Sequence, residues 1–231
     1  MTRLLLASNS TNPGQGYLDH LADELLEHFA ESRPVAFVPY ALRDLDGYAS
    51  TAKKRFEELG LHLVSIHESA DPAAALLDCE GIFVGGGNTF RLLERMMALS
   101  LIGPIRVLVR TGVPYLGTSA GSNVACPSIT TTNDMPIVQP PDLDALGLVD
   151  FQINPHYVDR DPDVPHGGET RQQRIMEFHE ENSTPVIGLR EGSWLSITDD
   201  AVELRGPNPA RLFRAGAEPR ELQPGPIGGF L

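Results

Sequence analysis

The chain has 231 residues, of which 41% are hydrophobic and 21% are charged, an ordinary composition for a soluble globular protein. Its net charge of −13 argues against a nucleic-acid partner, because an acidic surface would not neutralise backbone phosphates. The apolar runs, such as 4–7, are too short to cross a bilayer, and we expect neither a signal peptide nor a membrane partner. The two cysteines, Cys79 and Cys126, lack metal-ligand spacing and favour a reducing cytoplasm over a disulfide.

The first two-thirds of the chain alternates β-rich runs with helical patterns, which predicts an α/β fold with a mostly parallel sheet flanked by helices. Strands are expected at 3–8, 35–39, 62–66, 81–84 and 113–116, and helices at 17–30, 51–59, 72–79 and 90–99. A loop is expected at 130–141, a strand at 151–153 and a helix at 170–181. Short runs at 186–189, 193–197, 201–204 and 211–213 predict antiparallel C-terminal strands at an edge of the same sheet. No linker is apparent, so we expect a single domain over 1–231.

The most informative motif is Gly117-Thr118-Ser119-Ala120-Gly121, which directly follows the predicted strand at 113–116. A Gly-x-Ser-x-Gly sequence between a strand and a helix is typical of a nucleophile elbow, in which small neighbours permit a strained turn at the serine. Such a turn lifts the Ser119 hydroxyl above the sheet edge and directs the Ala120 N–H toward a bound carbonyl group. An ordinary strand-to-helix turn is the alternative interpretation.

A serine nucleophile needs a base, and among the seven histidines His156 is the strongest candidate. It follows the apolar strand 151–153 and a proline, and strand ends are where ligands bind in open α/β sheets. His166, in a glycine-rich turn, is the alternative. The base also needs a carboxylate to fix its tautomer, and Asp134 and Glu191 are both candidates.

The segment Val84-Gly85-Gly86-Gly87-Asn88-Thr89 joins a predicted strand to a predicted helix. Three glycines at such a turn leave backbone N–H groups open to a close approach. A phosphate-binding loop is the alternative, but neither the Lys-Ser/Thr of a P-loop nor a dinucleotide fingerprint is present. We therefore expect this loop to contribute to an oxyanion hole or to contact the substrate backbone.

The interval between Ser119 and His156 is too short for the βα units that separate these residues in α/β-hydrolases, so a different fold is indicated. The chain resembles the peptidase E family of serine-dependent α-aspartyl dipeptidases over nearly its whole length. The segments that carry the resemblance are 8–11, 84–90, 117–121, 126–127, 131–138, 153–156, 168–171 and 187–194, and the block Thr131-Thr132-Asn133-Asp134-Met135-Pro136-Ile137-Val138 is the most specific of them.

The resemblance implies a fold similar to class I glutamine amidotransferases. It also implies that Ser119 is the nucleophile and His156 the base, with Asp134 as the third member and Glu191 as a disputed alternative. The resemblance further implies that Gly86 and Gly87 supply oxyanion donors beside Ala120. The expected activity is hydrolysis of Asp-X dipeptides without a metal or other cofactor. A cyanophycinase-like hydrolase of β-aspartyl or other acidic peptides and a non-catalytic small-molecule binding domain are the alternatives.

An acidic protein needs a local cation to bind an acidic substrate, and Arg171 stands at the start of the helix that follows the His156 segment. A surface arginine paired with Glu169 or Glu177 is the alternative, but the resemblance assigns the matching arginine to the substrate aspartate. We assign substrate binding to Arg171 and Asn88. The expected partner is a small acidic dipeptide, the expected location is cytoplasmic, and a homodimer is left open.

Overall fold

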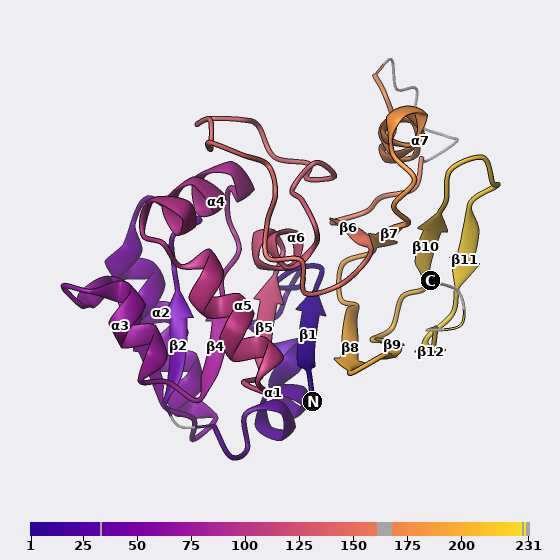
Figure 1. Cartoon of the computed structure of the whole chain (residues 1–231). Coiled ribbons are helices and arrows are strands. Elements are labelled where there is room, and N and C mark those ends of the chain that lie inside the picture. Colours follow the sequence, from indigo (N-terminus) through magenta and orange to yellow (C-terminus); the bar gives the residue numbers. More distant parts are fainter. Residues whose placement is uncertain (33, 161–167, 228, 230–231) are drawn as a thin grey trace.

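The computed structural model describes residues 1–32, 34–160, 168–227 and 229, and within them the strands form two sheets (Figure 1). The main sheet has the order β12-β9-β8-β1-β5-β4-β2-β3, and the second has the order β11-β10-β7-β6. The strands of the main sheet are β1 (Arg3–Ala7), β2 (Val35–Val38), β3 (Leu63–Ser65), β4 (Gly81–Val84), β5 (Tyr115–Thr118), β8 (Trp194–Thr198), β9 (Ala201–Arg205) and β12 (Gly225–Pro226). The second sheet contains β6 (Gln152–Pro155), β7 (Val186–Leu189), β10 (Ala210–Phe213) and β11 (Arg220–Leu222).

Helices cover both faces of the main sheet, and the last helix packs with residues of the second sheet. They are α1 (Ala22–His28), α2 (Leu45–Glu58), α3 (Pro72–Leu77), α4 (Thr89–Ala98), α5 (Ile102–Arg110), α6 (Ala120–Ala125) and α7 (Arg171–Glu181), with 3-10 turns at Asp19–Leu21 and Ile66–Glu68. The alternation along β1 decides the layers, because successive side chains point to opposite faces. Leu5 packs with residues of α1 and α2, whereas Leu4 and Leu6 pack with residues of α3, α4, α5 and α6. No helix among the described residues is long and apolar enough to span a membrane.

The predicted α/β class, with a mostly parallel sheet and antiparallel C-terminal strands, is confirmed. Strands β1 to β5 pair in parallel, and β8, β9 and β12 extend the sheet with antiparallel pairing. The expectation that all C-terminal strands share this sheet is wrong. Strand β1 already has β5 on one side and β8 on the other, so β7 has no place beside it and pairs instead with β6 and β10.

Helix α5 had no counterpart among the predicted elements. Gly103 and Pro104 obscure its helical pattern in the sequence, although proline is tolerated in the first turn of a helix, where N–H groups lack partners within the helix. The predicted helix at 17–30 is shorter than expected, because its first residues form the 3-10 turn Asp19–Leu21. Helix α2 begins earlier than expected because the Asp44 side chain caps it by accepting the Gly47 N–H.

The carboxyl ends of the adjacent strands β1, β5 and β4 meet at one edge of the main sheet. The chain continues from these strands into Ser8 and Asn9, into Ser119, and into Gly85–Gly87. The second sheet and α7 lie to the side of the main sheet that carries β8 and β9 (Figure 1). Ligands bind at the carboxyl ends of strands in open α/β sheets, so this edge is the place to examine for a site.

Candidate active site

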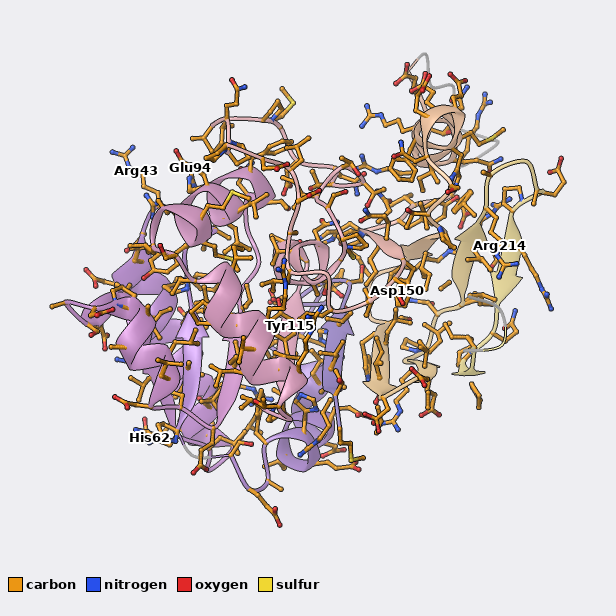
Figure 2. The ribbon with its side chains drawn as sticks, viewed as in Figure 1. Arg43, His62, Glu94, Tyr115, Asp150 and Arg214 are labelled. Carbon is orange, nitrogen blue, oxygen red and sulfur yellow. The ribbon has the colours of Figure 1, made fainter. Side chains whose placement is uncertain are left out.

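Ser119 occupies a strained turn between β5 and α6. Its φ of 52° and ψ of −109° lie outside the regions that residues with side chains ordinarily adopt. Its neighbours leave no room for further atoms: a Cβ on Gly117 would lie 2.5 Å from the Gly121 carbonyl oxygen, and a Cβ on Gly121 would overlap the Val84 carbonyl oxygen. The buried Tyr115 of β5, labelled in Figure 2, donates its hydroxyl to the Gly121 carbonyl at 2.7 Å. The predicted elbow geometry is therefore present.

Replacing Gly121 with alanine should destabilise the protein, because the added methyl group meets the backbone of β4 rather than a movable side chain. We expect the free energy of unfolding to fall by about 1–3 kcal/mol, as is typical of overpacking, measured by urea denaturation. Gly103→Ala in α5 is the matched control, because a Cβ there has nothing within 4 Å. The control should leave stability unchanged or raise it by up to about 1 kcal/mol. Equal stability of the two variants would contradict the packing argument.

His156 follows β6 and faces the serine, with Nε2 and Ser119 Oγ 2.9 Å apart. Its backbone is also unusual, with φ at 53°. Ser8 at the end of β1 holds this conformation, since its hydroxyl oxygen accepts the His156 N–H at 2.8 Å and its hydroxyl donates to the Leu189 carbonyl at 2.8 Å. Sequence reasoning gave Ser8 no role, although a small polar residue at the end of a central strand is a usable signal. His166 lies outside the described residues.

Glu191 is the carboxylate that contacts the histidine: its Oε1 lies 2.6 Å from His156 Nδ1. A carboxylate can only accept, so this contact places a proton on Nδ1 and leaves Nε2 free to accept the Ser119 hydroxyl. The Glu191 turn is held by Asn9, whose Oδ1 accepts the Gly192 N–H at 2.8 Å, and by Asn208, whose amide donates to the Glu191 carbonyl. The His156 and Glu191 side chains are 39% and 48% exposed, so water reaches this hydrogen bond.

Asp134 makes a different set of contacts. Its Oδ2 accepts the backbone N–H of Thr89 at 2.7 Å and the Thr89 hydroxyl at 2.6 Å, at the start of α4. The sequence left Asp134 and Glu191 as alternative partners of the base, with the resemblance favouring Asp134. The structure brings Glu191, and not Asp134, to the ring of His156.

The glycine-rich loop lies close to Ser119. A Cβ on Gly86 would lie 3.1 Å from the Thr118 carbonyl oxygen and 3.2 Å from Ser119 Cβ. Gly87 has a φ of 133°, which a residue with a side chain rarely adopts. The glycine-rich loop therefore passes directly beside the turn that carries Ser119.

Asn88 is engaged within the protein rather than open to a ligand. Its Oδ1 accepts the Arg91 N–H at 3.0 Å and caps α4, while its amide donates to the Met135 carbonyl at 2.9 Å. These bonds tie the loop containing Asp134 to the glycine-rich loop. Both the oxygen and the nitrogen of the Asn88 side chain thus have a hydrogen-bond partner within the protein.

A cleft of about 420 Å³ brings Ser119, His156 and Asp134 together. It is lined by Asn9, Ser10, Thr11, Leu42, Tyr48, Gly86, Gly87, Ser119, Asp134 and His156. Tyr48, which the sequence did not single out, reaches the cleft from α2. Burial raises the pKa of its hydroxyl, and the hydrogen bond from the Tyr17 side chain opposes this shift. Within the described ranges, no group of three or more His, Cys, Asp or Glu side chains is arranged to hold a metal ion.

Arg171 is the first residue of α7 and is half-buried. Glu169, one of its two expected surface partners, pairs instead with Arg174, at 3.6 Å. Burial and the neighbouring Arg174 lower the pKa of Arg171, while the charge of Asp134 opposes this shift. The guanidinium therefore lies within electrostatic range of a residue that lines the cleft.

A serine, a histidine and a carboxylate bonded in series at the carboxyl edge of an α/β sheet define the class of serine hydrolases. The model of peptidase family S51 matches residues 4–205, and the chain belongs to this family of serine peptidases. It is 51% identical to a peptidase E of Streptomyces coelicolor over 96% of this chain and 91% of that protein. It is 46% identical to a probable alpha-aspartyl dipeptidase of Drosophila melanogaster over 96% and 93% of the two chains.

A solved structure supports the fold. A putative peptidase E protein from Listeria monocytogenes superposes with a TM-score of 0.68 at 24% identity, covering 90% of this chain and 100% of that one. The family resemblance inferred from the sequence is confirmed by the family match over residues 4–205 and by the 51% identity to the Streptomyces protein.

Proposed function

We propose that this protein is a dipeptidase that hydrolyses dipeptides with an N-terminal aspartate through an acyl-enzyme on Ser119. The observation that carries the proposal is the continuous contact from Ser119 Oγ to His156 Nε2, at 2.9 Å, and from His156 Nδ1 to Glu191 Oε1, at 2.6 Å. The specificity is supported by the Drosophila relative, which is described as a probable alpha-aspartyl dipeptidase.

In the proposed mechanism, Ser119 Oγ attacks the peptide carbonyl carbon while His156 Nε2 takes the hydroxyl proton. Glu191 stabilises the resulting imidazolium, and N–H groups of Ala120 and of Gly86 or Gly87 hold the oxyanion. The tetrahedral intermediate collapses as His156 gives its proton to the leaving amine. Water then attacks the aspartyl ester with His156 again as base, which releases aspartate and restores Ser119.

The proposal is tested by measuring hydrolysis of Asp-Leu and of its β-aspartyl isomer by the purified protein. We expect turnover of Asp-Leu, with the β-aspartyl isomer cleaved far more slowly. Preference for the β-linked peptide would favour a cyanophycinase-like hydrolase. No turnover of either peptide, together with no labelling by a fluorophosphonate probe, would favour a non-catalytic binding domain. We further propose a cytoplasmic location, supported by the free cysteines Cys79 and Cys126.

We propose that Arg171 binds the side-chain carboxylate of the substrate aspartate. Arg171→Ala should therefore lower kcat/KM for Asp-Leu much more than for Asn-Leu. A charge-assisted contact in a partly desolvated site is worth about 2–5 kcal/mol, so the loss on Asp-Leu should be at least about thirty-fold.

Arg174→Ala is the matched control for this prediction, because it removes an equal charge from the same helix at a side chain that is 53% exposed and paired with Glu169. It should change kcat/KM for Asp-Leu by less than about three-fold, as expected for an exposed ion pair. Equal losses on Asp-Leu and Asn-Leu in Arg171→Ala would make Arg171 a structural residue.

A further inference from the structure

Arg190, which directly precedes Glu191, is held by two carboxylates from different parts of the chain. Its Nε donates to Asp159 Oδ2 at 2.8 Å, and its two terminal nitrogens donate to the oxygens of Glu221 at 2.9 and 2.8 Å. One of these nitrogens also donates to the Pro209 carbonyl at 2.7 Å. The arginine side chain is only 17% exposed, so its planar guanidinium is fixed on several sides in a setting largely shielded from water.

The contact with Asp159 connects Arg190 to the segment that carries the proposed base. Asp159 lies three residues after His156, whereas Arg190 directly follows β7. The guanidinium also lies over the ring of Tyr157, 5.6 Å from its centroid. This ring packs closely on β7, because a Cβ on Gly188 would lie 2.6 Å from it. Arg190 therefore joins the residues that follow β6 to the residues that follow β7.

Strands β10 and β11 complete this charge network. Arg211 of β10 donates to the other oxygen of Asp159 at 3.0 Å, and Arg211 stands opposite Glu221 in the pairing of β10 with β11. Positive and negative side chains thus alternate in the order Arg211, Asp159, Arg190, Glu221. The edge of the second sheet braces the two segments whose ends carry His156 and the Glu191 turn (Figure 1).

Arg190 is also the first residue of the turn that presents Glu191. The Ser193 N–H donates to the Arg190 carbonyl at 3.2 Å, and Gly192 has a φ of 79°, which favours glycine at the third position of a turn. Asn9 holds the later part of this turn through the Gly192 N–H. The Arg190 side chain anchors its beginning, so the position of the Glu191 carboxylate depends on both ends.

We propose that Arg190 is a positioning residue for the active site, which holds the Glu191 turn against the segment that follows His156 by bridging Asp159 and Glu221. The inference rests on the proposed function, in which Glu191 orients His156. Arg190 does not line the cleft, so it acts through Glu191 rather than on the substrate. Its loss should slow the chemical step and leave binding of the substrate almost unchanged.

The test uses Arg190→Met and measures two rates: hydrolysis of Asp-Leu, and labelling of Ser119 by a fluorophosphonate probe. Methionine keeps an apolar stem over the ring of Tyr157 and removes the charge with all its hydrogen bonds. The fold should persist, because Asp159 and Glu221 are each 42% exposed and water can solvate their carboxylates. Circular dichroism and the thermal midpoint check this.

Arg205→Met is the matched control. Arg205 pairs with Glu24 at 2.7 Å and with Glu203 at 2.8 Å, so its replacement also separates an arginine from two carboxylates. None of these three residues lines the cleft. The control should change kcat, KM and the labelling rate by less than about two-fold.

We expect Arg190→Met to lower kcat and the labelling rate by about ten-fold while KM changes by less than about two-fold, because a small misplacement of a catalytic group is sufficient for such a loss. In a Glu191→Gln background, Arg190→Met should lower kcat by less than about two-fold more, since the contact that it positions is already altered. Asp159→Asn weakens the same bridge from the other segment and should lower kcat by about three-fold or more, so it decides the question if Arg190→Met does not fold.

An unchanged kcat in both Arg190→Met and Asp159→Asn would overturn the inference. So would a loss that appears mainly in KM, or a ten-fold loss that persists undiminished in the Glu191→Gln background. If the unmodified enzyme is labelled by the probe but does not hydrolyse Asp-Leu, the proposed function fails, and the labelling rates of the variants still decide the inference. If the unmodified enzyme neither is labelled nor hydrolyses Asp-Leu, both fail.

Discussion

Ser119→Ala should lower kcat for Asp-Leu by at least about 10⁴-fold, because no other group can take over the attack on the peptide carbonyl. The fold should persist, since alanine removes a single oxygen and the elbow is shaped by Gly117 and Gly121. Circular dichroism and the thermal midpoint should therefore match those of the unmodified protein. Labelling by a fluorophosphonate probe should be lost together with activity.

Ser183→Ala is the control for this variant, because Ser183 is exposed and lies in the turn between α7 and β7. It should retain full activity and full labelling. Activity of Ser119→Ala near that of the control, or a probe adduct that persists in it, would place the nucleophile elsewhere.

Glu191→Gln should lower kcat by about 10²- to 10³-fold, because the amide presents a donor or a neutral acceptor to His156 Nδ1 and no longer stabilises the imidazolium. Neutralising a fully buried triad carboxylate in this way lowers kcat by about 10⁴-fold. The smaller loss is expected here because the His156 and Glu191 side chains are 39% and 48% exposed, so water screens the pair.

Asp134→Asn is the comparison that separates the two carboxylates. Because Asp134 Oδ2 is bonded to Thr89 rather than to His156, we expect this change to raise KM more than it lowers kcat. Steady-state kinetics of the two variants on Asp-Leu measures the difference. A larger fall in kcat for Asp134→Asn than for Glu191→Gln would reverse the assignment of the histidine partner.

Local sequence was sufficient for the motifs whose parts are adjacent in the chain. The elbow around Ser119 and the glycine-rich turn at Gly86 and Gly87 each join a strand to a helix, and their geometry depends on small residues within the motif itself. The position of His156 could be predicted for a similar reason, since it ends an apolar strand at the edge where ligands bind. Helix α5 was overlooked because Gly103 and Pro104 weaken the local signal of a helix that packing against the sheet stabilises.

The sequence by itself thus predicted the α/β class, the strained turn at Ser119 and the glycine-rich loop beside it, and it singled out His156, which the structure places 2.9 Å from Ser119 Oγ. Only the tertiary structure decided which carboxylate meets the base, because Asp134 and Glu191 both lie in irregular segments and offer the same chemical group. The deciding feature is the parallel pairing of β6 with β7, in which Pro155 stands opposite Leu189. This register places the residues that follow the two strands side by side, so Glu191 reaches His156 across 35 positions of sequence. Asp134 instead lies at the start of α4, where it accepts the N–H of Thr89, a group that has no partner within the helix.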